Sequence, residues 1–182
     1  MSHQEHQEAA ASDQSLGPAA CAVLTCSDTR TAAEDRGGDR VVSGLESAGH
    51  QVIARRLTRE DPASIDQSLS ELLEVGVDLL VCTGGTGIAR RDGTVERVRA
   101  RIDVELDGFG ELFRALSFEE IGASAMLSRA TGGVVRGKAL DTLLFALPGS
   151  TGAVELAMTR LILPELAHMR LLLRRSRSSD AP

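Results

Sequence analysis

The stretch LLVCTGGTGIARRDGT, residues 79–94, joins an apolar run to a glycine-rich turn. A continuous apolar run of this kind is typical of a strand covered on both faces of a parallel sheet. Glycines in the TGGTG segment, residues 83–87, allow positive φ angles and let backbone N–H groups approach an anion closely. A helix expected over residues 94–102 would add its positive N-terminal end. The stretch predicts a strand and an anion-binding turn, and a plain turn before a helix is the less favoured alternative.

Similar apolar runs alternate with segments of helical periodicity along the whole chain. We expect strands over residues 21–26, 51–57, 78–83, 132–137 and 142–149. We expect helices over residues 39–48, 61–76, 94–102, 108–116, 117–130 and 151–173. This alternation predicts the α/β fold class, with an open sheet that carries helices on both of its faces.

Local signals define several of the helix ends. Asp61 followed by Pro62 is a favourable N-cap with proline at the first helical position. Ser117 with Glu120 has the spacing of a capping box, which predicts a new helix there. Pro164 predicts a break or kink in the last helix.

Three polar loops follow expected strands and are the candidate ligand-binding segments. They are TCSDTR (residues 25–30), TGGTG (residues 83–87) and PGS (residues 148–150). In open α/β sheets, ligands bind outside the carboxyl ends of the strands. We therefore expect the three loops to open on one edge of the sheet.

Composition excludes several classes of protein. The 182 residues carry a formal net charge of −6, with no Trp or Tyr and only four Phe, so a nucleic acid is not an expected partner. No apolar stretch approaches the roughly 20 residues that span a bilayer, and the N-terminus has no signal-peptide pattern. The three cysteines lack a CxxC spacing and the histidines lack ligand spacing. We expect buried thiols, no structural zinc, no membrane association and a cytoplasmic location.

The length suggests one domain between two polar ends. We expect a disordered tail over residues 1–19, one folded domain over residues 20–173 and a polar tail over residues 174–182.

Asp92 is unexpected beside an anion-binding turn, because a carboxylate repels a phosphate. One interpretation is a helix N-cap, for which Thr94 would compete. The other is a metal ligand, since Mg²⁺ takes one or two carboxylates and completes its shell with water and phosphate oxygens. Glu60 and Asp61 form a second acidic pair at the exit of the second strand. Asp61 also serves as an N-cap, which leaves Glu60 freer to bind a metal.

These motifs together resemble the MoaB/Mog molybdopterin-binding family, to which the G domain of gephyrin is also similar. The resemblance rests on TGGTG with Asp92 and Thr94, on GFGELFR (108–114), LSFEEIG (116–122) and SRA (128–130), and on LPGS (147–150). It implies a three-layer α/β/α fold with a mostly parallel sheet, and assembly as a homotrimer or hexamer. It also implies that the protein adenylylates molybdopterin with ATP and Mg²⁺, releases pyrophosphate, and works with other molybdenum cofactor biosynthesis proteins.

The resemblance assigns roles to individual positions. Asp92 and Glu60 match the two catalytic, metal-binding acids, with Asp61 as the alternative to Glu60. Ser27 and Asp28 match the nucleotide-side positions. Apart from the resemblance, Arg91 is expected to bring positive charge to the phosphates of the nucleotide, whereas a solvated surface position is favoured for Arg90. The substrate-binding positions are Thr83, Gly84, Gly85, Thr86, Gly87, Ser117, Pro148, Gly149 and Ser150.

Some positions depart from the family pattern. Arg59 and Glu60 stand where the family has Pro-Asp, and Gly93 and Val95 replace a usual Val and Pro. Residues 36–38, Arg-Gly-Gly, replace a usual x-Ser-Gly. Glu60 keeps the charge of an aspartate but moves it outward by one C–C bond, and displacements of about 1 Å can lower a rate ~100-fold. A molybdopterin-binding or scaffold protein without catalysis is therefore the alternative function, and retention of Asp92 favours the enzyme.

Overall fold

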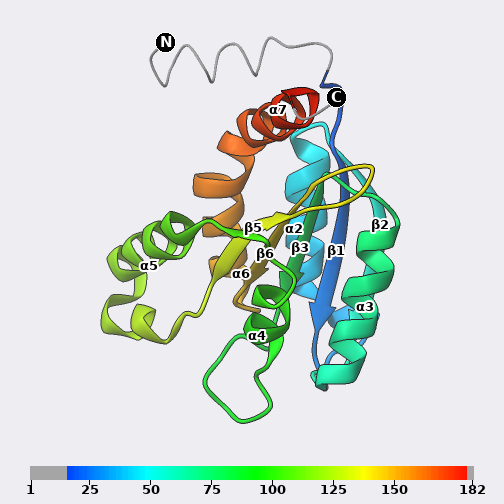
Figure 1. Ribbon diagram of the computed structural model, residues 1–182. Coiled ribbons are helices and arrows are strands. Elements are labelled where there is room, and N and C mark those ends of the chain that lie inside the picture. Colours follow the sequence, from blue (N-terminus) through cyan, green and yellow to red (C-terminus); the bar gives the residue numbers. More distant parts are fainter. Residues whose placement is uncertain (1–15, 180–182) are drawn as a thin grey trace.

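Six strands form one sheet in the computed structural model, which describes residues 16–179 (Figure 1). The strand order is β2-β1-β3-β6-β5-β4. β1, β2, β3 and β6 run parallel, whereas β5 is antiparallel to both of its neighbours. The bounds are Ala20–Cys26 (β1), Gln51–Thr58 (β2), Leu79–Thr83 (β3), Val104–Glu105 (β4), Thr131–Val135 (β5) and Thr142–Leu147 (β6). The prediction of a mostly parallel α/β sheet is confirmed, and only the two-residue β4 had no signal in the sequence.

Helices cover both faces of this sheet, so the fold has three layers (Figure 1). The α-helices are Arg36–Ser47 (α2), Pro62–Glu74 (α3), Thr94–Arg99 (α4), Asp107–Ile121 (α5), Thr151–Ala157 (α6) and Leu163–Ser179 (α7). Short 3₁₀-helices occupy Ala32–Glu34 (η1) and Gly122–Leu127 (η2), and a π-helix occupies Met158–Ile162 (η3).

The alternation of side chains along the central strands divides the interior into two cores. Val23 and Val81 pack with side chains of α2, α5, α6 and α7 on one face. Leu24 and Leu80 pack with α3 and α4 on the other. Because both faces are covered, β1, β3 and β6 contain almost no exposed side chain, which explains their continuous apolar sequences.

The expected helix boundary at Ser117 is wrong. α5 runs without interruption from Asp107 to Ile121, and residues 122–127 form a 3₁₀-helix rather than an α-helix. Ser117 is buried in the interior of α5. It lies on the same face of the helix as Phe109 and Phe113, about one turn beyond Phe113. Tertiary packing of that face outweighs the local capping signal, and the helix ends instead at Gly122, where φ is 60°.

The last helix bends at the expected place but does not break. The π-helix η3 ends at Ile162, two residues before Pro164, whose missing N–H removes an intrahelical hydrogen bond. Figure 1 shows the change of direction between α6 and α7. α7 then continues to Ser179, so the expected polar tail is helical over residues 174–179, where Arg177 pairs with the buried Asp141 at 2.9 Å. Residues 1–15 and 180–182 of the expected tails lie outside the described residues.

α2 begins at Arg36, three residues before the expected start, and its first turn contains two buried glycines, Gly37 and Gly38. Asp35 caps it, and the Asp35 carboxylate accepts hydrogen bonds from Gly38 N at 2.9 Å and Thr25 Oγ1 at 2.7 Å. A Cβ atom at Gly38 would lie 2.2 Å from that carboxylate, so this close packing requires glycine. α4 ends at Arg99 rather than at residue 102, a difference at a helix end where the last turn is irregular.

The three cysteines are buried and free, as expected. Burial raises the pKa of Cys26 to about 11 and that of Cys21 to about 12, so both remain thiols at neutral pH. Between residues 16 and 179, no helix has the length and apolar character needed to cross a membrane.

His50 lies beside the start of β1 and makes the stability of the fold depend on pH. Its Nδ1 atom accepts a hydrogen bond from Ala19 N at 3.2 Å, and burial and then Arg170 lower its pKa below the ordinary 6.5, against the opposing effect of Asp78. The unfolded chain therefore takes up this proton at a higher pH than the folded protein does, and stability is lost as the pH falls below about 6.5. We expect His50→Gln to reduce the slope of unfolding free energy against pH between about pH 5 and 7 in urea titrations. Equal slopes for the two proteins would contradict this expectation.

Candidate functional site

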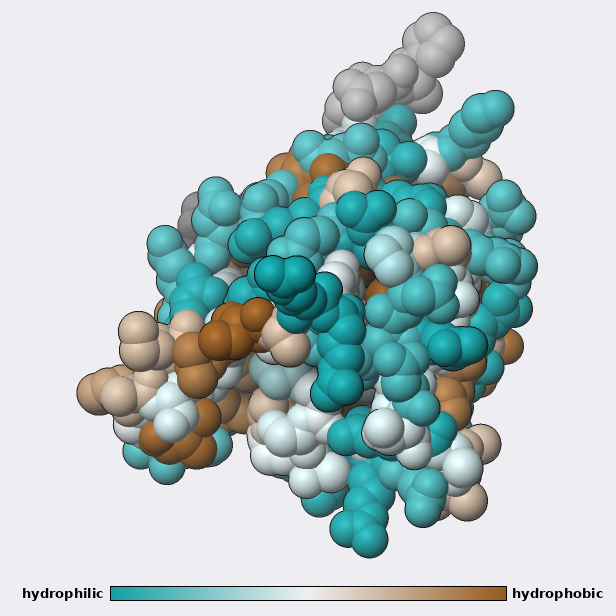
Figure 2. Space-filling view, turned by 90° about the horizontal axis from the view of Figure 1, so that it is seen from below, coloured by the Kyte–Doolittle hydropathy of each residue, from teal (hydrophilic) through white to brown (hydrophobic). Residues whose placement is uncertain are grey.

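The carboxyl ends of β1, β3 and β6 open on one edge of the sheet, at the bottom of Figure 1, which Figure 2 views face on. The loops that follow these strands, together with the exit of β2, line a cavity of about 400 Å³. The three loops expected to meet at one edge therefore do meet there. The lining residues are Cys26, Ser27, Thr29, Arg30, Glu60, Gly84, Gly85, Thr86, Gly87, Asp92, Leu127, Ser128, Pro148 and Gly149.

The TGGTG turn has the backbone conformation that its glycines predict. Gly84 and Gly85 have φ angles of 90° and 60°, in the left-handed region. A Cβ atom at Gly84 would lie 2.2 Å from Cys26 O, so the turn passes directly against the end of β1. Gly84 N donates to Leu147 O at 3.1 Å, and Thr83 Oγ1 donates to Pro148 O at 3.3 Å. These contacts fix the turn against the loop that follows β6.

Asp92 lies in the cavity wall and is not the N-cap of α4, because Gly93 occupies that position. Its Oδ2 atom accepts a hydrogen bond from Ala89 N at 2.8 Å, which closes the loop between the glycine turn and α4. The expectation that Asp92 or Thr94 caps the helix is therefore wrong. Thr94 is buried inside the first turn, and its Oγ1 atom has no hydrogen-bond partner among residues 16–179.

Arg129 holds the same loop from outside and was not identified from the sequence. Its guanidinium donates to Thr86 O at 3.1 Å and to Asp92 O at 3.0 Å, and it pairs with Glu96 at 2.6 Å. The SRA motif contains this residue, but no local pattern shows that its partners lie up to 43 positions away.

Glu60 and Asp61 occupy different environments. Glu60 lines the cavity, and its side chain is only 14% exposed. Burial, then the charges of Asp28 and Asp92, raise the pKa of Glu60, while Arg91, whose Nε atom lies 3.7 Å from Glu60 Oε2, opposes this shift. Asp61 does not line the cavity: its Oδ1 atom accepts from Ser64 N at 3.0 Å and caps α3.

Ser27 and Asp28 organise the loop after β1. Ser27 Oγ accepts hydrogen bonds from Thr29 N at 3.3 Å and Arg30 N at 3.2 Å. Asp28 Oδ1 accepts from Glu60 N at 3.0 Å and so connects this loop to the exit of β2. Ser27 lines the cavity, whereas Asp28 is exposed beside it.

Arg30 lies in the same cavity and was also missed by the sequence interpretation. Its Nη2 atom donates to Gly149 O at 3.0 Å, across 119 positions of chain.

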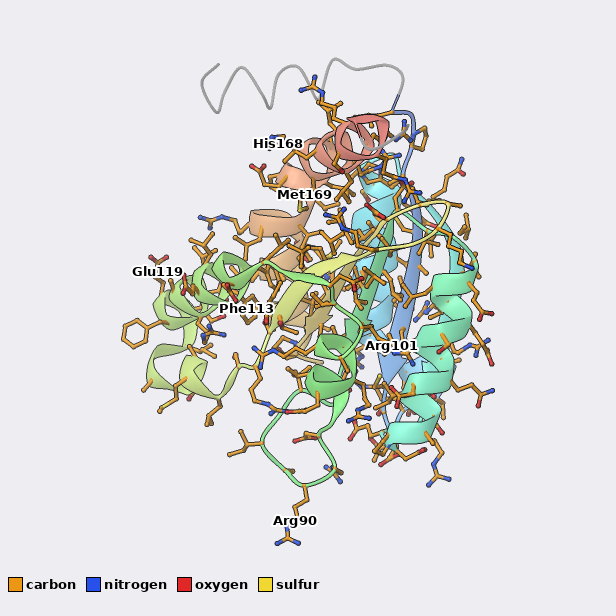
Figure 3. All side chains as sticks on the ribbon, in the orientation of Figure 1. Arg90, Arg101, Phe113, Glu119, His168 and Met169 are labelled. Carbon is orange, nitrogen blue, oxygen red and sulfur yellow. The ribbon has the colours of Figure 1, made fainter. Side chains whose placement is uncertain are left out.

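Other expected site residues lie elsewhere. Ser117 lies within α5 and is absent from the cavity wall. Its role in substrate binding stays a prediction, but no helix begins at Ser117 to direct N–H groups toward a ligand. Ser150 caps α6 by accepting from Ala153 N at 3.3 Å, while Pro148 and Gly149 line the cavity. Arg91 lies at the mouth beside Glu60, and Arg90 points from the loop into solvent (Figure 3).

The donors around the cavity suit a hard cation only in part. Glu60 and Asp92 are two carboxylates on one cavity wall, and the charge of Asp92 contributes to the raised pKa of Glu60. In the described part of the chain, no group of three or more His, Cys, Asp or Glu side chains gathers in a way that could hold a metal by itself. The pair therefore fits a cation whose remaining ligands are water and phosphate oxygens, which is the coordination typical of Mg²⁺.

This fold and site define an α/β protein with a cavity at the carboxyl edge of its sheet, lined by a glycine-rich turn and two carboxylates. Residues 22–168 match the family described as "Probable molybdopterin binding domain", and the chain belongs to this family. The resemblance inferred from its motifs is thereby confirmed.

The chain is similar to curated proteins named "Molybdenum cofactor biosynthesis protein B", among them those of two Bacillus species. The protein from Bacillus cereus is 48% identical over 151 residues, which cover 82% of this chain and 87% of the relative. The one from Bacillus subtilis is 43% identical over 171 residues, covering 93% and 95%.

Solved structures agree with this assignment. A crystal structure of Molybdenum cofactor biosynthesis protein B is 46% identical, with a TM-score of 0.80 over 87% of this chain and 97% of the other. The tungsten cofactor synthesizing protein MoaB from Pyrococcus furiosus is 35% identical, with a TM-score of 0.79 over 86% of this chain and 98% of the other.

Proposed function

We propose that this protein acts in molybdenum cofactor biosynthesis and adenylylates molybdopterin, using ATP and releasing pyrophosphate. The observation that carries the proposal is the joint placement of the TGGTG turn, Asp92 and Glu60 around one cavity. Membership of the molybdopterin-binding family and the names of its relatives support the choice of substrate and pathway.

The reaction requires two anionic substrates to approach each other. An oxygen of the terminal phosphate of molybdopterin attacks the α-phosphorus of ATP and forms a phosphoanhydride bond to AMP. The bond between the α-phosphorus and the oxygen bridging to the β-phosphorus breaks, and pyrophosphate leaves with that electron pair. Because the attacking phosphate is already anionic at pH 7, no strong general base is needed, and catalysis depends on positioning and charge.

The residues of the cavity support this division of roles. The backbone N–H groups of Gly85 and Gly87 are proposed to hold the molybdopterin phosphate, whereas that of Gly84 already donates to Leu147 O. Ser27 and Asp28 are proposed to orient the nucleotide beside Arg91. Mg²⁺ bound with Asp92 and Glu60 would neutralise phosphate charge and stabilise the leaving pyrophosphate. Asp61 is not included, since its carboxylate already caps α3.

A second candidate is molybdopterin binding without catalysis. It is favoured by Glu60, which is longer than the aspartate of the family pattern and lies close to Arg91. The test is to incubate the purified protein with molybdopterin, Mg-ATP and pyrophosphatase and to measure adenylylated molybdopterin. Product formation well above an Asp92→Asn control supports the enzyme. Equally little product from both proteins, with molybdopterin bound by both, would establish the second candidate.

Replacement of Glu60 measures how much its length matters. We expect Glu60→Gln to lower the rate of adenylyl transfer about 10- to 100-fold, because one of the two acids at the cation is lost. Glu60→Asp restores the family residue and should retain or raise the rate. Both variants keep the Glu60 backbone N–H that donates to Asp28, so they are a matched pair. A Glu60→Gln variant as active as wild type would show that Glu60 has no part in the reaction.

We also propose that the protein forms a homo-oligomer, a trimer or hexamer, through the apolar surface of α5 and η2. This surface is the brown area at the left of Figure 2. It consists of Leu112, Phe118, Ile121, Met126 and Leu127, which are 52–78% exposed. Exposed apolar patches of this kind mark interaction sites.

Phe118 is the residue with which to test this surface. Its side chain is 62% exposed, so Phe118→Glu should leave the fold intact but reduce the assembly to monomers. Light scattering after size-exclusion chromatography measures the mass. Glu119→Gln on the same helix is the control and should assemble normally. A monomeric wild-type protein, or an unchanged mass for Phe118→Glu, would disprove the proposed interface.

A further inference from the structure

Arg30 is the only basic side chain among the residues that line the cavity in the described part of the chain. Glu60 and Asp92 provide the negative charge of the same wall. Arg91 approaches Glu60 from the mouth of the cavity, with a side chain that is 70% exposed. Arg129 is occupied by Thr86 O, Asp92 O and Glu96. An anion that enters the cavity therefore meets one cation, the guanidinium of Arg30.

The position of Arg30 is fixed at both ends. Its backbone N–H donates to Ser27 Oγ at 3.2 Å, and its Nη2 atom donates to Gly149 O at 3.0 Å. A Cβ atom at Gly37 would lie 3.4 Å from Arg30 Nη1, and one at Gly149 would lie 3.5 Å from the same atom. The guanidinium thus packs against two glycines from the first turn of α2 and the loop after β6. A side chain held in this way loses little further freedom when a ligand binds.

Most of the hydrogen-bonding capacity of Arg30 is unused. A guanidinium has five N–H donors, and among residues 16–179 only Gly149 O accepts from one of them. No carboxylate in this part of the chain lies within ion-pair distance of Arg30, although its charge is felt by Glu60. A half-buried guanidinium without an acidic partner is suited to bidentate recognition of phosphate oxygens.

The surroundings of Arg30 indicate which part of a ligand it contacts. A Cβ atom at Gly149 would lie 3.2 Å from Gly84 Cα, so Arg30 lies over the junction of the TGGTG turn and the loop after β6. The residue also belongs to the loop that carries Ser27 and Asp28. It therefore lies where a phosphate on the glycine turn and a phosphate on the nucleotide side would approach each other.

We propose that Arg30 binds a phosphoryl group of the substrates through its free N–H donors and holds it between the loops after β1, β3 and β6. This inference rests on the proposed function and adds a binding residue to it. The shared chemistry is a phosphate oxygen, supplied either by the polyphosphate chain of ATP or by the terminal phosphate of molybdopterin.

The test is calorimetric titration of Mg-ATP, molybdopterin and inorganic pyrophosphate, each separately, into wild type, Arg30→Gln, Arg30→Lys and Arg90→Gln. Arg30→Gln should weaken binding about 10- to 100-fold for the ligand that Arg30 contacts, as expected for charge-assisted hydrogen bonds. Arg30→Lys keeps the charge but loses the planar fork, so its binding should also weaken, though less. Arg90→Gln removes the same charge from a side chain that points into solvent and should bind like wild type (Figure 3).

The pattern of losses identifies the ligand. A loss for Mg-ATP alone assigns Arg30 to the nucleotide, a loss for molybdopterin alone assigns it to the pterin phosphate, and losses for both assign it to their junction. Unchanged affinity for both in Arg30→Gln would overturn the proposal, whatever the melting temperature of the variant. If the wild-type protein binds neither Mg-ATP nor molybdopterin, the proposed function fails. The affinity for inorganic pyrophosphate then tests the role of Arg30 independently of that function. Weaker pyrophosphate binding by Arg30→Gln would then support the role of Arg30, whereas equal binding, or none by wild type, would exclude it.

Discussion

Replacement of Asp92 by Asn is expected to lower the rate of adenylyl transfer about 100- to 1000-fold, the loss typical when a fixed electrostatic contact to a transition state is removed. Asparagine removes the negative charge that would bind a cation in the cavity. It keeps a side-chain oxygen that can accept from Ala89 N, as Asp92 Oδ2 does at 2.8 Å. The loop should therefore hold its shape, and molybdopterin should still bind. Single-turnover measurement of adenylylated product, beside a binding titration, separates the two effects.

Asp61→Asn is the matched control for this experiment. It removes one negative charge at the neighbouring residue to Glu60, and asparagine caps helices as well as aspartate does. Since Asp61 caps α3 and does not line the cavity, we expect this variant to retain activity within about two-fold of wild type. An active Asp92→Asn protein would exclude the proposed role of Asp92 while leaving the enzymatic function standing.

Replacement of Asp78 by Ala is expected to destabilise the fold by about 3–5 kcal/mol, because it leaves a buried guanidinium without its partner. Arg170 is 4% exposed, and its Nη2 atom lies 3.2 Å from Asp78 Oδ2. The same carboxylate oxygen accepts from Ala20 N at 2.9 Å. Arg170 in turn donates to Leu16 O and Gly17 O, both at 2.9 Å. The pair joins α7 to the start of β1, so its loss weakens two distant segments together.

Urea unfolding followed by circular dichroism measures this effect. Arg40→Ala is the comparison, since Arg40 pairs with Glu155 at the surface, where both side chains are about half exposed, and such pairs contribute about 0–1 kcal/mol. The double variant Asp78→Leu with Arg170→Met should recover much of the loss, because apolar side chains replace a buried pair at little cost. A loss below about 1 kcal/mol for Asp78→Ala would show that Arg170 reaches solvent when unpaired.

The local sequence contained enough information for the main course of the chain. Apolar runs identified β1, β2, β3, β5 and β6 to within one or two residues at most ends, because strands covered on both faces must be continuously apolar. Clustered glycines predicted the turn after β3, since few other residues adopt positive φ. Where a capping signal competed with packing, at Ser117, packing decided the result, because a buried helical face stabilises more than one capping box.

The sequence by itself thus determined the α/β class, the glycine turn and the presence of acidic groups near it. Only the tertiary structure decided that Glu60 faces the cavity while Asp61 caps a helix. It also brought Arg30 to Gly149, 119 positions along the chain, and Arg129 to Asp92, 37 positions away. Periodicity and turn conformation depend on neighbours in the chain and can be read from them. The direction of a side chain into a shared cavity depends on how distant loops approach one another at the edge of the folded sheet.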